Sequence, residues 1–101
     1  MRLFLYGTLL GDRRLGPSAP AILMGWRRVG LRGTRYPTLR RDRQGAVSGA
    51  VVDVPAPVLR RLVAYEGPAY RLARVVVRTA SGKTAAYAWI APGGTRRPWR
   101  E

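Results

Sequence analysis

The sequence predicts an α+β fold, a small mixed β-barrel of about six short strands with one main helix. Three observations support this class. Short valine-rich stretches are separated by glycine and proline, which is typical of small barrels. One stretch alone has the apolar spacing of a helix. The length of 101 residues suits a single domain with one core.

The first two strands are predicted from apolar runs with glycine punctuation. Residues 2–6 (RLFLY) form a buried strand that stops at Gly7. Residues 8–15 are a short helical or irregular connection. Residues 20–31 follow as a strand, and Gly25 predicts a bend or bulge in it.

The middle of the chain predicts two further strands joined by a turn. Residues 38–43 read as a short edge strand, and residues 46–54 as a strand rich in valine. Gln44 and Gly45 between them predict that the chain turns there.

One helix is predicted over residues 56–65. Pro55 and Pro57 mark its start, because proline is tolerated in a first helical turn. Gly67 followed by Pro68 ends it.

The last part of the chain predicts a hairpin and a tail. Residues 70–79 and 84–90 are its strands, and residues 81–83 (SGK) its turn. We expect residues 1–91 to form a single domain. Residues 92–101 have no periodic pattern and predict a loose tail.

The amino-acid composition restricts the chemistry. The chain has no cysteine and no histidine, which excludes disulfides, thiolate metal sites and catalytic pairs built on histidine. Five acidic residues scattered along the chain do not suggest a metal cage. We therefore expect no metal and no cofactor. Carboxylates, tyrosines, hydroxyls, arginines and backbone groups remain for catalysis.

The charge is strongly positive, at +14, and every basic residue except Lys83 is arginine. Bulk arginine beside alanine, glycine and proline is a compositional bias that leaves a solvated surface. The other interpretation is an electrostatic footprint for an anionic partner, with nucleic acid as the less favoured case. No run approaches a membrane span or a signal peptide, so we expect a cytoplasmic protein with no membrane partner.

Glu66 is the carboxylate that needs an explanation. One face of the predicted helix combines three apolar residues with it: Leu59, Leu62, Val63 and Glu66. Burial and the negative end of the helix dipole both raise a carboxyl pKa, which suits a general acid or base near neutral pH. Pairing of Glu66 with one of the many arginines is the equally open structural alternative.

The first predicted strand ends in a glycine turn, within residues 3–9 (LFLYGTL). Successive backbone N–H groups in such a turn can bind an anion or a developing oxyanion. The turn by itself is also compatible with an ordinary connection between a strand and a loop.

These segments together resemble the γ-glutamylcyclotransferase-like family, also called AIG2-like. The similarity rests on YGTL at residues 6–9, GAVVDVP at residues 49–55, AYEG at residues 64–67 and a following Tyr70-Arg71 strand. Residues 35–39 (RYPTL) also resemble a family segment near the pocket, without an assigned role. The chain departs from the family pattern at Val63, where the family has aspartate, and at Leu72, where it has a second arginine.

The resemblance implies a fold, a reaction and a site. It implies that Glu66 is the catalytic acid/base. It also implies a set of substrate-binding residues: Tyr6, Gly7, Thr8, Leu9, Tyr70 and Tyr87. The match at Tyr87 is open to a shift of about two positions along its strand.

The implied reaction is cleavage of a γ-glutamyl amide. The substrate's own α-amine attacks its γ-carbonyl, forming 5-oxoproline and releasing the attached amine, with no metal or cofactor. Two alternatives stay open: a noncatalytic binding module for an anionic partner, and a family member that has lost activity. The sequence does not identify the released amine or the oligomeric state.

Overall fold

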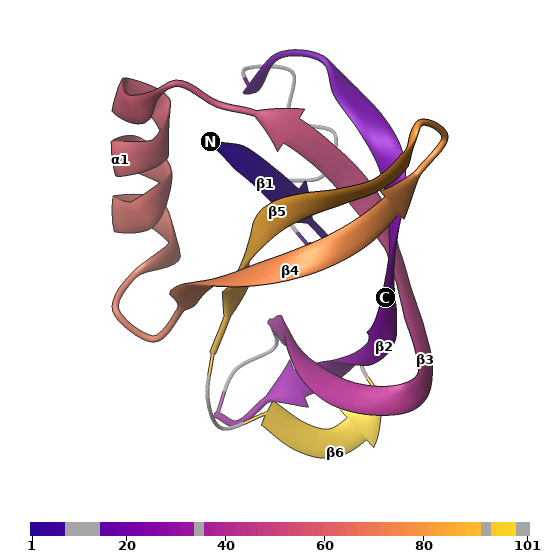
Figure 1. Ribbon diagram of the computed structural model, residues 1–101. Coiled ribbons are helices and arrows are strands. Elements are labelled where there is room, and N and C mark those ends of the chain that lie inside the picture. The colour runs from indigo at the N-terminus through magenta and orange to yellow at the C-terminus, as the bar shows by residue number, and fades with distance from the viewer. Residues whose placement is uncertain (8–14, 34–35, 92–93, 99–101) are drawn as a thin grey trace.

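Six strands and one helix make up the described part of the chain (Figure 1). The computed structural model describes residues 1–7, 15–33, 36–91 and 94–98. In chain order the elements are β1 (Arg2–Leu5), β2 (Ser18–Leu31), β3 (Pro37–Asp53), α1 (Ala56–Glu66), β4 (Arg71–Thr79), β5 (Gly82–Ile90) and β6 (Gly94–Pro98).

The strands form a closed mixed barrel, as the sequence predicts. The sheet order is β3-β1-β5-β4-β2-β6, and a further pairing of β3 with β2 closes five of the strands into a ring. β1 and β5 run parallel, whereas the other neighbours are antiparallel. Closure removes the free edges that an open sheet of this size would expose.

Alternation along the strands separates two cores. Phe4 of β1 and Val75 of β4 belong to the cluster inside the barrel. Leu3 and Leu5, one residue to either side of Phe4, belong to a second cluster that also contains Leu62 of α1. Successive side chains of a strand point to opposite faces, so β1 contributes to both cores at once. Figure 1 shows α1 against the outside of the barrel.

The predicted bulge at Gly25 is confirmed, but the predicted turn at Gly45 is wrong. β3 is one continuous strand rather than two strands joined by a turn. Its pairing with β2 shifts between Met24 and Trp26, where residues 42–45 of β3 lie opposite Gly25 alone. A Cβ on Gly45 would stand 2.3 Å from the carbonyl oxygen of Trp26. The glycine therefore permits a close strand approach at the bulge, and the chain does not reverse.

The predicted helix and the final hairpin are confirmed. α1 starts after Pro55 and ends at Glu66, one residue beyond the prediction. β4 and β5 pair from Arg71 with Ile90 to Thr79 with Gly82. The connection is residues 80–81, so Gly82 and Lys83 of the predicted turn (81–83) belong to β5.

Residues 94–98 form β6, within the segment for which we expected no regular structure. β6 pairs with Val29 and Leu31 of β2. The pairing partner lies more than sixty residues earlier in the chain, so no local pattern indicates it. Among the described residues, no helix is long and apolar enough to cross a membrane.

Candidate active site

The last turn of α1 brings Glu66 to the barrel. Leu62 is buried, and Val58 and Leu59 pack against the same second cluster. Val63, which we expected on the buried face, is 47% exposed. It lies about 100° around the helix from Leu62, and the buried stripe is centred near Leu62. Glu66 falls within that narrower stripe and is half-buried.

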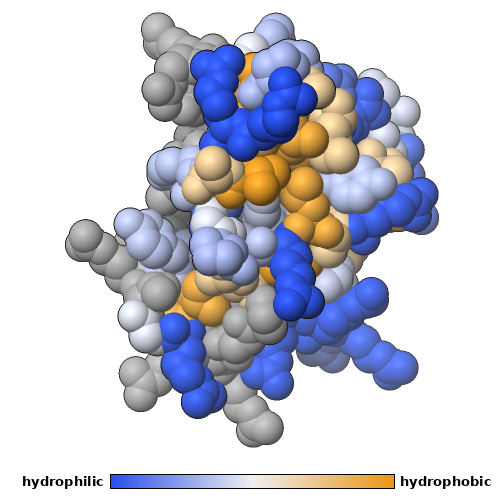
Figure 2. Space-filling view, turned by 90° about the vertical axis from the view of Figure 1, so that its left-hand side faces the viewer, coloured by the Kyte–Doolittle hydropathy of each residue, from blue (hydrophilic) through white to orange (hydrophobic). Residues whose placement is uncertain are grey.

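A cavity of about 190 Å³ opens beside Glu66. Its walls come from the end of β1, the start of β3, the last turn of α1, the residue before β4 and the end of β5. The lining residues are Phe4, Leu5, Tyr6, Gly7, Tyr36, Pro37, Tyr65, Glu66, Tyr70 and Trp89. Figure 2 shows the face that carries α1, with apolar side chains in its middle and hydrophilic ones at its margins.

The environment of Glu66 favours its protonated form. Burial raises the pKa of the carboxyl above its ordinary value. The last turn of α1 contains no basic residue to offset the helix dipole. In residues 1–7, 15–33, 36–91 and 94–98, no arginine forms an ion pair with Glu66. The described structure therefore gives no support to the arginine-pairing alternative.

Two tyrosine hydroxyls on the cavity wall donate to backbone carbonyls. Tyr6 donates to the carbonyl oxygen of Trp89. Tyr70 donates to the carbonyl oxygen of Pro37 at 2.7 Å. With their protons engaged, both hydroxyl oxygens keep lone pairs that can accept hydrogen bonds from a ligand.

The charge of Glu66 contributes to the raised pKa of both tyrosines. Burial is the main cause that raises the pKa of Tyr6, and the charges of Tyr70 and Glu66 add to it. Burial also raises the pKa of Tyr70, followed by the charges of Glu66 and Tyr36. The three groups are thus within electrostatic range of one another, and both tyrosines stay neutral at physiological pH.

The loop after β1 is described only at its start. Tyr6 and Gly7 line the cavity, whereas Thr8 and Leu9 lie outside the described residues. Gly7 does not have a positive φ, so its backbone is not in the left-handed region that favours glycine. The guanidinium of Arg28 donates to the carbonyl oxygen of Tyr6 at 3.2 Å and anchors the peptide that precedes Gly7.

Tyr87 is the predicted site residue that the structure does not bring to the cavity. It is partly buried and packs against the second cluster. Trp89, two positions further along β5, lines the cavity instead. The shift equals the register ambiguity of the sequence match, since residues two apart share one strand face.

Six lining residues were not predicted as site residues: Phe4, Leu5, Tyr36, Pro37, Tyr65 and Trp89. Two of them belong to RYPTL, the segment whose resemblance we noted without a role, and Tyr65 directly precedes Glu66. The sequence does not show that these segments meet around one cavity, so no local pattern could identify these residues as part of the site. In the described ranges, no group of three or more acidic side chains could hold a metal ion.

Searches for similar proteins identify the fold and the family. No curated protein matches the sequence. Among solved structures, At5g39720.1 from Arabidopsis thaliana superposes with a TM-score of 0.81 at 23% identity, over 99% of this chain and 74% of that one. At3g28950.1 from the same plant has a TM-score of 0.76 at 26% identity, over 89% of this chain and 61% of that one. A structure titled gamma-glutamyl cyclotransferase has a TM-score of 0.76 at 19% identity, over 93% and 68%.

In the described part of the chain, the closed barrel with α1 packed against it is therefore a gamma-glutamyl cyclotransferase-like fold. The family model for gamma-glutamyl cyclotransferase, AIG2-like proteins matches residues 3–100. The chain belongs to that family.

Proposed function

We propose that this protein cleaves a γ-glutamyl amide by cyclisation, with Glu66 as the acid/base. One observation carries the proposal: the half-buried carboxylate on the wall of the cavity has a pKa raised by burial, and no described arginine neutralises it. A raised carboxyl pKa suits proton transfer in both directions near neutral pH. Membership of the family supports the same reaction.

In the proposed reaction, Glu66 both takes up and gives back protons. Its carboxylate takes a proton from the substrate's α-ammonium, which frees the nitrogen lone pair. The α-nitrogen attacks the γ-carbonyl carbon, and the carbonyl electron pair moves to oxygen. Glu66 then returns its proton to the leaving nitrogen, and the oxyanion re-forms the carbonyl as the amide C–N bond breaks. The ring nitrogen still carries one proton more than the lactam, and Glu66 passes that proton to the released amine. The products are 5-oxoproline and an amine, and Glu66 is a carboxylate again.

The hydroxyl oxygens of Tyr6 and Tyr70 suit the substrate's α-ammonium. Both present lone pairs beside Glu66, and no described basic side chain lines the cavity. Three acceptors around one ammonium would hold it in the cyclising conformation, which is the main task when nucleophile and electrophile share a molecule.

Backbone N–H groups of the loop from Tyr6 to Leu9 are the proposed donors to the oxyanion. Gly7 contributes from the described part of that loop, and Thr8 and Leu9 are included on resemblance alone. Tyr87 is left out of the proposal because it is not among the described residues that line the cavity.

The size of the cavity indicates which part of the substrate it holds. A volume of about 190 Å³ is below the roughly 300–1,000 Å³ of pockets for drug-sized ligands. It therefore suits a γ-glutamyl head group, with the leaving amine at the mouth. Tyr36 and Tyr65 line that cavity and are 50% and 63% exposed, so they are placed to contact the amine.

The test is release of 5-oxoproline from a panel of γ-glutamyl amides by the wild-type and Glu66→Gln proteins. The substitution keeps the shape of the side chain and removes proton transfer. We expect wild-type turnover and a loss of kcat of about 10²–10⁴-fold in the variant.

Two outcomes would contradict the proposal, one for the role of Glu66 and one for the reaction. Undiminished turnover by Glu66→Gln would show that the assigned role is wrong. No turnover of any amide by the wild type, with γ-glutamyl ligands still bound, would indicate a member of the family that binds without catalysis.

A further inference from the structure

One wall of the barrel, formed by strands β2 to β5 away from the cavity, carries exposed aliphatic side chains. Ile22, Met24 and Val76 are 42%, 54% and 49% exposed. They are three of the seven large hydrophobic residues that are exposed in the described ranges. Two others, Tyr36 and Tyr65, line the cavity, so the three aliphatic residues have no role in the proposed reaction.

The strand register gathers these side chains into one row. Ile22 of β2 pairs with Arg78 of β4 in antiparallel register. The same register carried two residues further sets Met24 across from Val76. Met24 pairs with Ala46 of β3, and Val76 pairs with Ala85 of β5. Both alanines are exposed. The resulting aliphatic row crosses four strands: Ala46, Met24, Val76 and Ala85, with Ile22 beside it.

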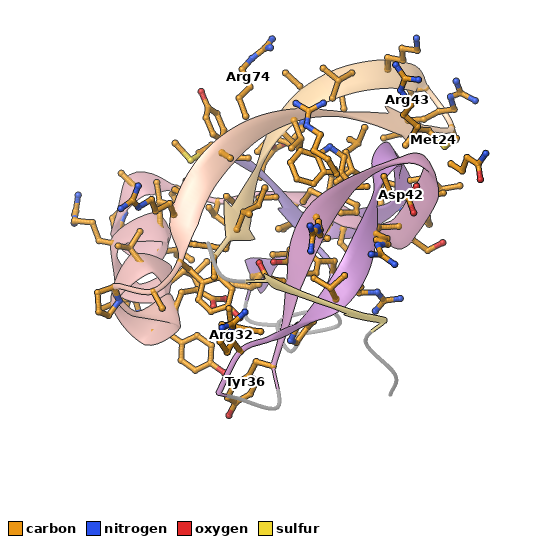
Figure 3. All side chains as sticks on the ribbon, turned by 90° about the horizontal axis from the view of Figure 1, so that it is seen from below. Met24, Arg32, Tyr36, Asp42, Arg43 and Arg74 are labelled. Atoms are coloured by element: carbon orange, nitrogen blue, oxygen red, sulfur yellow. The ribbon has the colours of Figure 1, made fainter. Side chains whose placement is uncertain are left out.

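Cations flank the aliphatic row on both sides. Arg74 and Arg78 are exposed two residues either side of Val76. Lys83 of β5 is exposed and lies directly across from Arg78 in the strand register. In Figure 3, Arg43, Met24 and Arg74 all lie along the upper side of the barrel.

The acidic residues of the described ranges do not cancel this charge. Asp42 lies at the same corner as Met24 in Figure 3, but its carboxylate faces Arg27 at 3.9 Å. Asp53 pairs with Arg2 at 3.1 Å, and Glu66 lines the cavity. The wall is therefore aliphatic at its centre and positive at its margins.

We propose that this wall docks on the surface of an anionic phospholipid bilayer. Aliphatic side chains enter the interface between headgroups and acyl chains, and arginine and lysine beside them contact the phosphates. The outer wall of a closed barrel is convex, so it offers no groove for a peptide. The aliphatic row contains no aromatic ring on which a nucleic-acid base could stack.

This docking revises our expectation of no membrane partner. That expectation rested on the absence of a run long enough to span a bilayer. Surface contact needs no span. It needs a few side chains from several strands on one face, and these strands lie far apart in the sequence.

The experiment measures binding of the whole protein to vesicles by flotation. Vesicles of phosphatidylcholine alone are compared with vesicles that also contain phosphatidylglycerol. We expect binding to the anionic vesicles, and weaker binding as salt rises. The high net charge alone would also cause salt-dependent binding to anionic vesicles. Variants that lose the same charge at different places distinguish the wall from the rest of the surface.

The deciding pair is Arg74→Ala/Arg78→Ala against Arg60→Ala/Arg61→Ala. Both variants lose two exposed arginines, the first pair from the wall and the second from α1. At about fivefold in affinity per cation near the surface, the wall variant should bind about 25-fold more weakly than wild type. The α1 variant should lose less than about threefold. Equal losses would overturn the proposal.

The aliphatic contribution has its own matched control. Val76→Thr should weaken binding to anionic vesicles several-fold, whereas Val63→Thr on α1, with a similar exposure, should not. Unfolding temperatures of all variants show whether each is folded. The proposal would also be overturned if a single-stranded oligonucleotide bound with the same dependence on Arg74 and Arg78 while the vesicles did not bind. None of these readouts requires turnover, so the result is independent of the proposed reaction.

Discussion

At the scale of single residues, the surroundings of Glu66 set its chemistry. It is the one charged residue among those that line the cavity in the described ranges. The hydroxyls of two neutral tyrosines beside it donate to backbone carbonyls, and burial favours the protonated form of Glu66. A carboxylate held this way is suited to proton transfer, and it is also a liability for stability.

Replacing Glu66 with glutamine is expected to stabilise the fold at neutral pH and not in acid. Burial raises the pKa of the folded carboxyl above its usual 4.5, so folding favours the protonated form. The stability that the group contributes is complete below pH 4.5 and is lost as pH rises through the folded pKa. Glutamine resembles the protonated form at every pH. Removing a negative charge from the C-terminal end of α1 should by itself gain about 0.3–1 kcal/mol at neutral pH.

Thermal unfolding of both proteins from about pH 4 to about pH 8 checks this expectation. The two curves should converge in acid and separate as pH rises. A constant difference, or a variant that is less stable at neutral pH, would contradict the account of Glu66 as a buried charge without a partner.

Two of the three tyrosines that the sequence predicts in the site, Tyr70 and Tyr87, should behave differently when they are replaced. Tyr70→Phe removes the 2.7 Å hydrogen bond to the carbonyl of Pro37. It should cost about 0.5–1.5 kcal/mol of stability and raise KM or lower kcat, because a cavity acceptor is lost. Tyr87→Phe should leave turnover close to wild type, because Tyr87 does not line the cavity. Steady-state kinetics and thermal unfolding of both variants test this, and an equal loss of activity would restore Tyr87 to the site.

At the scale of elements, the end of α1 determines where Glu66 points. The N–H of Gly67 donates to the carbonyl of Val63 at 3.2 Å and closes the helix. Gly67 has φ 83° and ψ 176°, a backbone region that is essentially restricted to glycine. The residue after the proposed acid/base therefore fixes the end of its helix.

Gly67→Ala should strain this end and misplace Glu66. A Cβ there meets no atom within 4 Å, so the cost is backbone strain of about 1–3 kcal/mol and not a clash. Unfolding temperature should fall by roughly 4–8 °C for each kcal/mol, and kcat should fall with it. Gly82→Ala is the control, because Gly82 has φ 108° in the β4–β5 turn, away from the cavity. Gly82→Ala should lower stability by a similar amount and leave kcat unchanged. Loss of kcat in both variants would show that strain anywhere affects turnover.

At the scale of the whole molecule, the barrel carries far more positive than negative charge. The net charge is +14, and the ion pairs of Asp53 with Arg2 and of Asp42 with Arg27 are exposed or partly exposed. Repulsion among arginines must therefore be screened mainly by counterions. The same excess supplies the attraction that the membrane-docking wall would use.

Salt should stabilise this fold. Between low ionic strength and about 0.15 M, the screening length falls from about 30 Å to about 8 Å, and repulsion across the barrel weakens. We expect the unfolding temperature to rise over that range and then level off. Sodium chloride and choline chloride should act alike if screening is the cause. No change with either salt would mean that the charges are too far apart to matter.

Much of the fold and part of the site follow from local sequence signals. Pro55 and Gly67 mark the ends of α1, and Gly25 marks the bulge, because these residues restrict the backbone wherever they occur. The apolar spacing of the helix places Glu66 on the buried stripe. These features depend on neighbours within a few residues, so the sequence by itself determines them.

Other features depend on contacts between distant segments, and only the tertiary structure decides them. Gly45 reads as a turn in isolation, but β2 runs beside both halves of β3 and makes it a bulge. β6 forms because β2 offers it a partner. Trp89 lines the cavity instead of Tyr87 because closure of the barrel, not the spacing within β5, sets which residue reaches the end of α1. Local patterns carry backbone preference, whereas the cavity and the aliphatic row exist only once the strands are in register.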